Sequence, residues 1–355
     1  MAYTTIDNPE LFFQTVLYTG NGSDDRDITL PGDEDMQPDL VWLKSRDTNN
    51  YNHFWTDSVR GVTKYIKSDG TSAENTLSGS VKAFNSDGFR VGTEADVNNN
   101  TTTYVAWCWK AGGSASSNSD GSITSSVSAN TTSGFSIVSW TGTGSTGTLG
   151  HGLGVTPQMI IVKKRDTSGT DWITFGSVLG GTVGSEFIKL NFVNAKTTGL
   201  NTSWFNQTAP TSSVFTVGTQ SDLNGSSATY IAYCFVEKKG YSKIGSYTGN
   251  GNTDGPFVYT GFRPAWIISK RTDNSSGGEW NILDNKRDTF NVADAKLEAN
   301  NTDAEETDEM YDILSNGFKI TRGDGNINAS SGTYIFMAFA ESPFVNSNGV
   351  PTNAR

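Results

Sequence analysis

Histidine and cysteine are scarce in this chain, with two of each among 355 residues. His53 and His151 lie far apart in the sequence. A zinc site needs three or four nitrogen or sulfur ligands close together, so we predict no metal ion. The sequence also lacks a Gly-x-Ser-x-Gly elbow, a phosphate-binding Gly-x-x-x-x-Gly-Lys loop and a His-Glu-x-x-His pair. We therefore predict no catalytic residue and no cofactor.

Basic runs and long apolar runs are also missing. The net charge is −11 and the pI is about 4.7, so we expect no nucleic-acid partner. No apolar run is long enough to span a bilayer, which predicts no membrane insertion. The first five residues lack the basic and apolar regions of a signal peptide, so we expect synthesis in a cytoplasm.

Four short patterns recur three times in the same order and at nearly constant spacing. They are an aromatic-Thr-Gly-x-Gly turn, a proline followed by an apolar run ending in lysine, a Phe-centred segment and a Tyr-led apolar run. Such self-similarity predicts a triplicated module of about 100 residues, the usual size of a domain. The copies start these patterns at Tyr18, Pro38, Phe89 and Tyr104, at Trp140, Pro157, Phe215 and Tyr230, and at Tyr247, Pro264, Phe318 and Tyr334.

Short apolar runs broken by Gly, Asn, Asp and Ser predict an all-β fold of three tandem β-sandwiches, jelly-roll or lectin-like. The two nearly all-apolar runs of each copy fit strands covered on both faces or the inner strands of a sandwich. The best helical candidate is short, Asp303–Met310. We place the β-sandwich repeats at 1–112, 135–240 and 241–355, the last with a C-terminal tail, and a Ser/Gly-rich linker or edge strand at 113–134.

The two cysteines occupy the same position in two copies of the Tyr-led run. Cys108 and Cys234 should therefore lie in different cores as small buried residues. We predict that both are free thiols. Ala338 holds this position in the third copy, as a packing role permits.

Acidic residues raise two further possibilities. Asp57 and Asp284 stand at matching places, and paired carboxylates are the groups that glycoside hydrolysis uses. The second copy has Gly176 there, so a turn acid explains the pattern better than a catalytic pair. Acidic clusters provide the oxygen ligands that Ca²⁺ prefers, but none has the full calcium-loop pattern. These clusters are Asp24, Asp25 and Asp27, then residues 33–35, then Asp324 with Asn326 and Asn328.

Four tryptophans lie outside the most apolar runs. Flat aromatic faces bind sugar rings and cations, so these residues are the candidate ligand-facing aromatics, with core packing as the alternative. They are Trp55, Trp172, Trp204 and Trp280.

The landmark residues resemble a repeat-domain family of uncharacterised function found in tail-fibre and other virion structural proteins of marine tailed bacteriophages. The resemblance rests on Tyr18–Gly22, Pro38–Lys44, Asp57–Gly61, Phe84–Phe89 and Tyr104–Lys110, and extends through Gly121–Lys163 to the end of the chain. The third copy departs from it, with Asp284-Asn285-Lys286-Arg287 in place of an Asp-Ser-x-Arg turn. The resemblance implies a place in the virion and carries over no catalytic residues.

Three functions compete on this basis. The first is a non-enzymatic tail fibre or fibre-associated host-recognition component, whose partners would be other virion proteins and a host surface glycan or protein receptor. Such fibres are usually trimeric, which would also hide sheet edges. The second is a capsid decoration or cement protein. The third is an enzyme, a glycan depolymerase, which the scattered acids do not favour.

Overall fold

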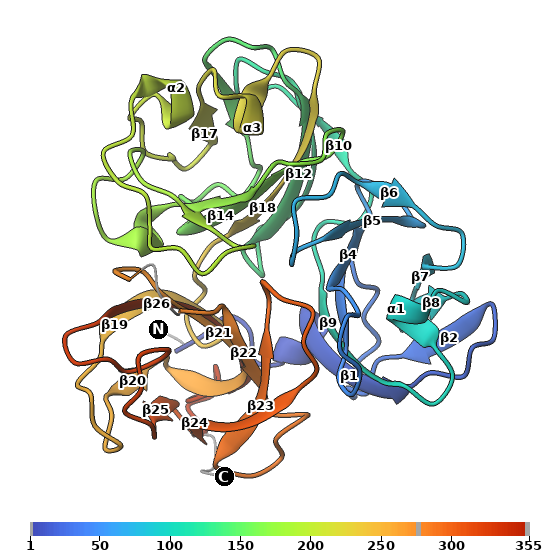
Figure 1. Ribbon diagram of the computed structural model, residues 1–355, viewed down its shortest axis with the longest axis vertical. Helices are drawn as coiled ribbons and strands as arrows, with labels where there is room; N and C mark the ends of the chain where they lie inside the picture. Colours follow the sequence, from blue (N-terminus) through green and yellow to red (C-terminus); the bar gives the residue numbers. More distant parts are fainter. Residues whose placement is uncertain (1–2, 275–277, 352–355) are drawn as a thin grey trace.

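The computed structural model describes residues 3–274 and 278–351 and consists mainly of β-strands. It arranges the chain as three lobes around a common centre (Figure 1). The prediction of an all-β fold is confirmed, and each described helix has only three or four residues. These helices are η1 (Pro9–Leu11), α1 (Ala95–Asn98), η2 (Ser177–Leu179), α2 (Thr202–Phe205) and α3 (Ser221–Asn224).

Lobe 1 contains two antiparallel sheets. The larger has the strand order β1-β9-β3-β4-β5-β6, and the smaller has the order β2-β8-β7. Their strands are β1 (Phe13–Thr19), β2 (Arg26–Thr29), β3 (Leu40–Ser45), β4 (Phe54–Asp57), β5 (Lys64–Lys67), β6 (Asn75–Thr76), β7 (Val81–Asn85), β8 (Gly88–Val91) and β9 (Thr103–Trp109).

Lobe 2 has a seven-stranded sheet in the order β10-β11-β12-β18-β14-β15-β16 and a two-stranded sheet, β13-β17. The first two strands come from the segment 113–134 and form one edge of the larger sheet. The strands are β10 (Ser116–Asn118), β11 (Ser125–Asn130), β12 (Phe135–Thr141), β13 (Gly147–Gly150), β14 (Met159–Lys164), β15 (Trp172–Phe175), β16 (Ile188–Lys189), β17 (Val214–Val217) and β18 (Thr229–Phe235).

Lobe 3 is built on a single eight-stranded sheet in the order β19-β26-β21-β22-β23-β24-β25-β20. The helix predicted at Asp303–Met310 is wrong, because most of this segment lies in β24, paired with both β23 and β25. Local acidity did not reveal those neighbours. The strands are β19 (Ser242–Thr248), β20 (Phe257–Tyr259), β21 (Phe262–Arg271), β22 (Asn281–Asp284), β23 (Ala293–Glu298), β24 (Glu306–Leu314), β25 (Gly317–Ile320) and β26 (Thr333–Pro343).

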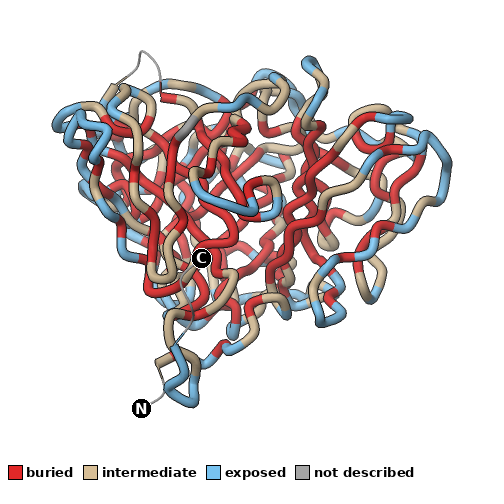
Figure 2. Tube along the Cα trace, turned by 90° about the horizontal axis from the view of Figure 1, so that it is seen from below, coloured by how far each residue is buried: buried red, intermediate tan, exposed pale blue. Residues whose placement is uncertain are grey.

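The large sheets are buried on both faces. One face of each sheet contributes to a central apolar cluster, which includes Trp42, Tyr233 and Trp266 from lobes 1, 2 and 3. The opposite face packs on a cluster local to its lobe. Figure 2 accordingly shows buried chain throughout the middle of the molecule, with exposed chain at its margins. The lobes are therefore joined by a shared core, while their division into three tandem β-sandwiches stays a prediction.

A buried asparagine explains the recurring Thr-Gly-x-Gly turn of lobe 1. The Asn98 side chain is fully buried, and its carboxamide accepts the backbone N–H of Asn21 and donates to the carbonyl of Ser23. A Cβ on Gly20 would lie 2.0 Å from the carbonyl oxygen of Asn99, so only glycine fits there. The turn motif is therefore held in place by hydrogen bonds to the Asn98 side chain. Asn224 and Asn328 accept the N–H of Thr143 and Asn250 in the same way.

Candidate functional site

Strand pairing defines equivalent positions in the three lobes. In each lobe the aromatic residue of the turn motif lies directly opposite the tyrosine that leads the long apolar strand, and the two rings stack. The pairs are Tyr18 and Tyr104, Trp140 and Tyr230, and Tyr247 and Tyr334. Every other position can then be compared by counting along the strands from these pairs.

The junction between lobes 1 and 2 contains a buried carboxylate. Asp57 forms an ion pair with the Nε of Arg60, and both side chains are fully buried. The hydroxyl of Tyr233, from lobe 2, donates to Asp57 Oδ2 over 2.8 Å. Arg60 also contacts Glu74, which in turn pairs with Arg165 of lobe 2 over 2.8 Å. The acid therefore joins two lobes.

Opposing effects set the ionisation of this junction. Burial alone would lower the pKa of Arg60, but the charges of Asp57 and Glu74 outweigh it and raise the pKa. Burial raises the pKa of Tyr233 well above its usual value, so its hydroxyl stays protonated and donates to Asp57. The buried ion pair of Asp57 and Arg60 is therefore stabilised by further polar partners from both lobes.

Lobes 3 and 1 meet through the same arrangement. Asp284 pairs with Arg287 Nε at 2.6 Å, again with both side chains fully buried. The indole Nε1 of Trp107, from lobe 1, donates to Asp284 Oδ2 over 2.9 Å. Glu305 links Arg287 to Arg46 of lobe 1, at 3.1 and 2.8 Å. Burial opposes ionisation of Glu305, but Arg46 and Arg287 outweigh it and lower its pKa.

Among the residues that the structure describes, the junction between lobes 2 and 3 does not repeat this chain of charges. The strand registers place Gly176 at the position of the acid, Leu179 at that of its arginine and Met337 at that of the lobe-crossing donor. Removing only one partner would leave an unpaired buried charge, which costs several kcal/mol. The positions of the acid, its arginine and the donor are all uncharged here, while Lys196 takes the place of Glu74 and Glu305 and pairs with Glu186 at 3.0 Å.

A backbone hydrogen bond is kept at all three junctions. The N–H of Glu74 donates to Arg165, that of Glu305 to Arg46, and that of Lys196 to Thr272. The backbone contact between lobes is therefore the same whether the residue is Glu74, Glu305 or Lys196, and the carboxylates of Glu74 and Glu305 add ion pairs to it.

These contacts decide the role of Asp57 and Asp284. Each carboxylate accepts an arginine, a donor from a neighbouring lobe and two backbone N–H groups of its own turn. Both side chains have no exposed surface. A glycosidase acid must reach the scissile bond of a bound sugar. These two acids instead act as structural links between lobes.

Three of the four candidate ligand-facing tryptophans are core residues. Trp55, Trp172 and Trp280 have exposed fractions of 1%, 0% and 1%, and all belong to the central cluster. Their faces are covered by aromatic neighbours or apolar side chains of other lobes, so they offer no ring face to a ligand. The sequence showed only that they flank apolar runs. Trp204 is half-buried, and its ring packs on Phe187 at a centroid distance of 4.4 Å.

Trp172 and Trp280 also fasten the lobes to each other. The Trp172 indole donates to the carbonyl of Lys67 in lobe 1, and that of Trp280 to Lys189 in lobe 2, both over 2.8 Å. The equivalent residue in lobe 1 is His53, whose Nε2 lies 3.0 Å from the carbonyl oxygen of Glu298 in lobe 3. A closed ring of three side-chain contacts thus surrounds the central cluster.

Both histidines have structural partners. His53 accepts the indole N–H of Trp42, and burial together with the charge of Lys44 lowers its pKa well below the usual value. His151 accepts the N–H of Leu153, and burial lowers its pKa as well. Both rings therefore accept hydrogen bonds within the fold.

The lysine that ends each proline-led run was assigned no role from the sequence. Lys44, Lys163 and Lys270 are fully buried in equivalent places. Their ammonium groups donate to backbone carbonyls, such as Ser45 O for Lys44 and Val193 O for Lys270, both over 2.9 Å. Burial lowers the pKa of each to about 8.

The cysteines and the acidic clusters serve packing and surface pairing. Cys108 and Cys234 are free, buried and in different local clusters, as predicted, and burial raises the pKa of both thiols. Lys82 lies 2.8 Å from both Asp24 and Asp25. Across residues 3–274 and 278–351, no group of three or more His, Cys, Asp or Glu side chains is arranged to hold a metal ion.

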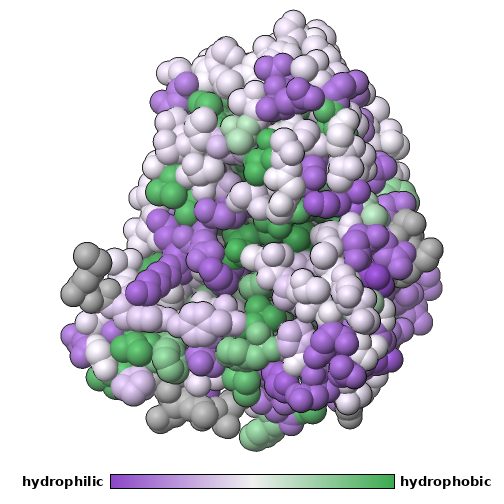
Figure 3. All heavy atoms as spheres, turned by 90° about the vertical axis from the view of Figure 1, so that its left-hand side faces the viewer, coloured by the Kyte–Doolittle hydropathy of each residue, from purple (hydrophilic) through white to green (hydrophobic). Residues whose placement is uncertain are grey.

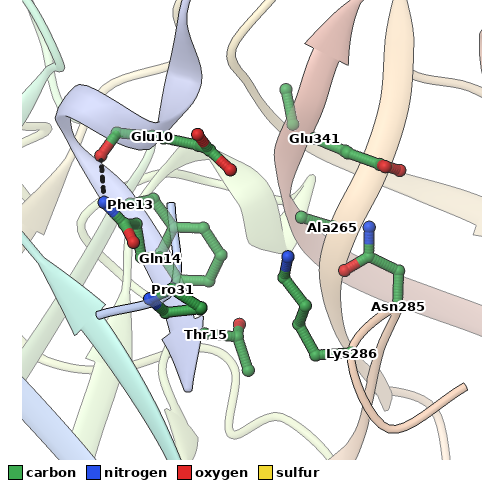
Figure 4. Close-up of a pocket in the computed structure, with 10 residues that line it drawn as sticks. Glu10, Phe13, Gln14, Thr15, Pro31, Ala265, Asn285, Lys286 and Glu341 are labelled. Carbon is green, nitrogen blue, oxygen red and sulfur yellow. Dashed lines mark hydrogen bonds between the residues drawn. The ribbon is translucent and has the colours of Figure 1, made fainter. Parts of the chain in front are cut away.

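A small cavity lies between lobes 1 and 3 (Figure 4). The side chains of Glu10 and Gln14 line one wall, and those of Lys286 and Glu341 line the other. Its volume of about 30 Å³ accommodates roughly one water molecule. It is too small for a sugar or a cofactor.

Lobe 3 has a larger opening, between the two end strands of its sheet. A groove of about 360 Å³ lies between β19 and β20. It is lined by Gly245 and Tyr247 on one side and by Phe257 and Tyr259 on the other. Phe257 and Tyr259 are 46% and 53% exposed, which is unusual for aromatic residues in this protein. The sequence did not predict this groove, because β19 and β20 are consecutive in the chain but lie at opposite ends of the strand order in the sheet.

Comparison with known protein families identifies a family for this chain. A family model described as "Domain of unknown function (DUF7483)" matches residues 8–343, nearly the whole chain. No curated protein matches the sequence of this chain significantly. None of the helices in the described part of the chain is long and apolar enough to cross a membrane.

Proposed function

We propose that this chain, which belongs to the DUF7483 family of unknown function, is a non-enzymatic structural protein of a bacteriophage virion. Within the virion we assign it to the tail, as a fibre or fibre-associated host-recognition component. The landmark residues that resemble virion structural proteins support this assignment. We also propose that each lobe is a copy of one sandwich module.

One observation carries the structural role. The two best-placed acids, Asp57 and Asp284, are buried ion-pair centres that connect lobes. The aromatic residues that could stack on sugars are used in the shared core. The buried acids and the core tryptophans therefore hold the three large sheets together, which suits a protein that must stay rigid outside a cell.

Immunogold labelling of intact virions tests the proposal. The expected result is gold at the tail, with no gold in a matched reaction using antibody preadsorbed on the purified chain. Absence of label on virions from which the protein is recovered by mass spectrometry would contradict a surface-exposed virion component.

A capsid decoration protein is the second candidate. The compact packing of three lobes on one core, without an extended shaft, favours it (Figure 1). Labelling over the head rather than the tail would select this candidate.

The enzyme alternative has its own test. Purified chain incubated with host envelope is expected to release no reducing sugar. Release that disappears in an Asp57→Asn or Asp284→Asn variant, with folding shown unchanged, would instead make the protein a depolymerase.

We further propose that the protein works as a homotrimer bound to other virion proteins and to a host surface glycan or protein receptor. Light scattering on the purified chain measures the first part directly. A mass of three chains is expected, and a mass of one chain at micromolar concentration would contradict it.

A further inference from the structure

We propose that the groove between β19 and β20 of lobe 3 binds one extended β-strand of a partner protein by strand addition. The two strands that border it are the ends of the eight-stranded sheet, so each has a neighbouring strand on one side only. An unpaired strand edge presents a row of backbone N–H and C=O groups that an incoming strand can satisfy. This inference does not depend on the virion assignment.

Lobe 2 shows what occupies the equivalent groove. There, β11 pairs antiparallel with β12, which is the counterpart of β19. Just before β11, Ile123 forms a bridge to Leu149 in β13, the counterpart of β20. The side chains of Ile123 and Val127 are buried in the local cluster of lobe 2. An extended segment of the chain itself thus fills the groove and pairs with both borders.

Lobe 1 closes its groove in another way. Gln14 of β1 donates to the carbonyl of Glu34 over 3.0 Å and accepts the N–H of Gly32 over 2.8 Å. One side chain therefore ties the β1 edge to the segment that follows β2. In lobe 3 the equivalent residue is Lys243, which forms an ion pair with Glu237 at 2.7 Å instead.

Within the part of the chain that the structure describes, the lobe 3 groove has neither filling. The Tyr3 hydroxyl lies 3.1 Å from that of Tyr259 at the rim. At the places where Thr148 and Gly150 lie beneath the filling segment of lobe 2, lobe 3 has the exposed aromatics Phe257 and Tyr259. Figure 3 shows the side of the molecule that lies to the left in Figure 1. Hydrophobic side chains gather on the lower part of this side, over lobe 3.

The floor of the groove indicates the side chain that the partner presents. Val138 of lobe 2 lies opposite Ala232, whereas lobe 3 has Gly245 opposite Phe336. The Phe336 ring approaches within 3.2 Å of the position that a Cβ on Gly245 would take. Val127 contributes an aliphatic side chain at this point in lobe 2. The partner strand should likewise run antiparallel to β19 and point an aliphatic side chain at Gly245 and Phe336.

A tethered copy of the lobe 2 segment provides the test. The full chain is extended at its C-terminus by a flexible Gly/Ser linker of about 30 residues, which spans roughly 30 Å, followed by a second copy of residues 122–130. Tethering sets an effective concentration of about a millimolar, so weak pairing is detected. Hydrogen–deuterium exchange is then followed by mass spectrometry at dilute protein.

Strand addition predicts that exchange in residues 242–248 slows by roughly tenfold or more. Two matched controls share the linker: one carries a scrambled copy, and the other has proline at the position of Val127, which removes a backbone donor. Neither should protect β19. In the tethered protein, Phe257→Ser should reduce the protection, because it removes an exposed aromatic at the groove rim.

Equal exchange in the tethered chain and both controls overturns the proposal, as does protection confined to β1 of lobe 1. Protection of β19 that appears in the untethered chain and rises with its concentration also overturns it, because the occupant would then be a second copy of this protein.

Discussion

The hydroxyl of Tyr233 donates to Asp57 across the boundary between two lobes, and the two residues are 176 positions apart in the sequence. The matching contact at another boundary joins Trp107 and Asp284. At the third boundary both the acid and the donor are missing, with Gly176 and Met337 in their places. Acid and donor are therefore both present or both replaced at each boundary. This agrees with the high energetic cost of leaving a buried charge without a partner.

Breaking the Asp57 cluster one residue at a time should be costly. We expect Asp57→Asn to lower the free energy of unfolding by about 3–5 kcal/mol, because Arg60 loses its buried counter-ion. Tyr233→Phe removes one hydrogen bond to a charged group and should cost about 1.5–3 kcal/mol. Urea denaturation followed by fluorescence measures both.

Replacing the whole cluster should cost less than breaking it. The triple variant Asp57→Gly, Arg60→Leu, Tyr233→Met copies the apolar junction formed by Gly176, Leu179 and Met337. We expect it to unfold at a higher urea concentration than Asp57→Asn, since no buried charge is left alone. A triple variant less stable than Asp57→Asn would show that the ion pair stabilises the junction directly.

Stability should rise with pH between about 8 and 9. Lys44, Lys163 and Lys270 have pKa values of about 8 in the folded chain, lowered by burial. Above pH 8 these three lysines bind more protons in the unfolded chain than in the folded chain, and linkage makes stability increase by up to about 1.4 kcal/mol per pH unit for each lysine. The thiols and tyrosines whose pKa values are raised by burial act in the opposite direction as the pH rises above about 9. Below pH 8 both states are protonated and this contribution levels off. Denaturation midpoints at several pH values measure the slope.

Lys163→Met is the variant that isolates this effect. Removing one of the three buried lysines should reduce the slope between pH 8 and 9 by up to about 1.4 kcal/mol per pH unit. Lys164→Met, which removes one lysine at a half-buried neighbouring position, is the matched control. The same slope in both variants would mean that the lysines do not titrate in this range.

The cysteines should be protected until the chain unfolds. Burial raises the pKa of Cys108 and Cys234, so little reactive thiolate is present or accessible. Iodoacetamide labelling, read by mass spectrometry, is expected to modify both in urea and neither in native buffer. Cys234→Ala should cost only about 1 kcal/mol, because Ala338 fills the equivalent site. Rapid native labelling of either thiol would contradict the burial.

Trp172 and Trp204 should respond differently to substitution. Trp172→Ala empties a fully buried site and loses the hydrogen bond to Lys67, so we expect a loss of about 3–5 kcal/mol. Trp204 is half-buried at the edge of its cluster, and Trp204→Ala should cost less. Thermal unfolding of both variants gives the comparison. Equal losses would mean that the two rings are equally embedded.

Much of the local structure could be predicted from the residues. The recurring Tyr-led and Pro-led runs are central strands, as their continuous apolar character indicated. The shared position of Cys108 and Cys234 correctly predicted two separate thiols. The acidic segment at 303–310 misled because its neighbours in β23 and β25 are specified by pairing rather than by its own residues.

The recurring pattern by itself predicted the all-β fold, the two apolar strands of each lobe and the turns marked by Thr-Gly-x-Gly. Only the tertiary structure decided that Trp55, Trp172 and Trp280 face a shared core, that Asp57 meets Tyr233, and that β19 and β20 leave a gap. The reason is physical: apolar periodicity shows that a strand face must be covered, but it does not specify what covers it. That choice depends on contacts between residues more than a hundred positions apart.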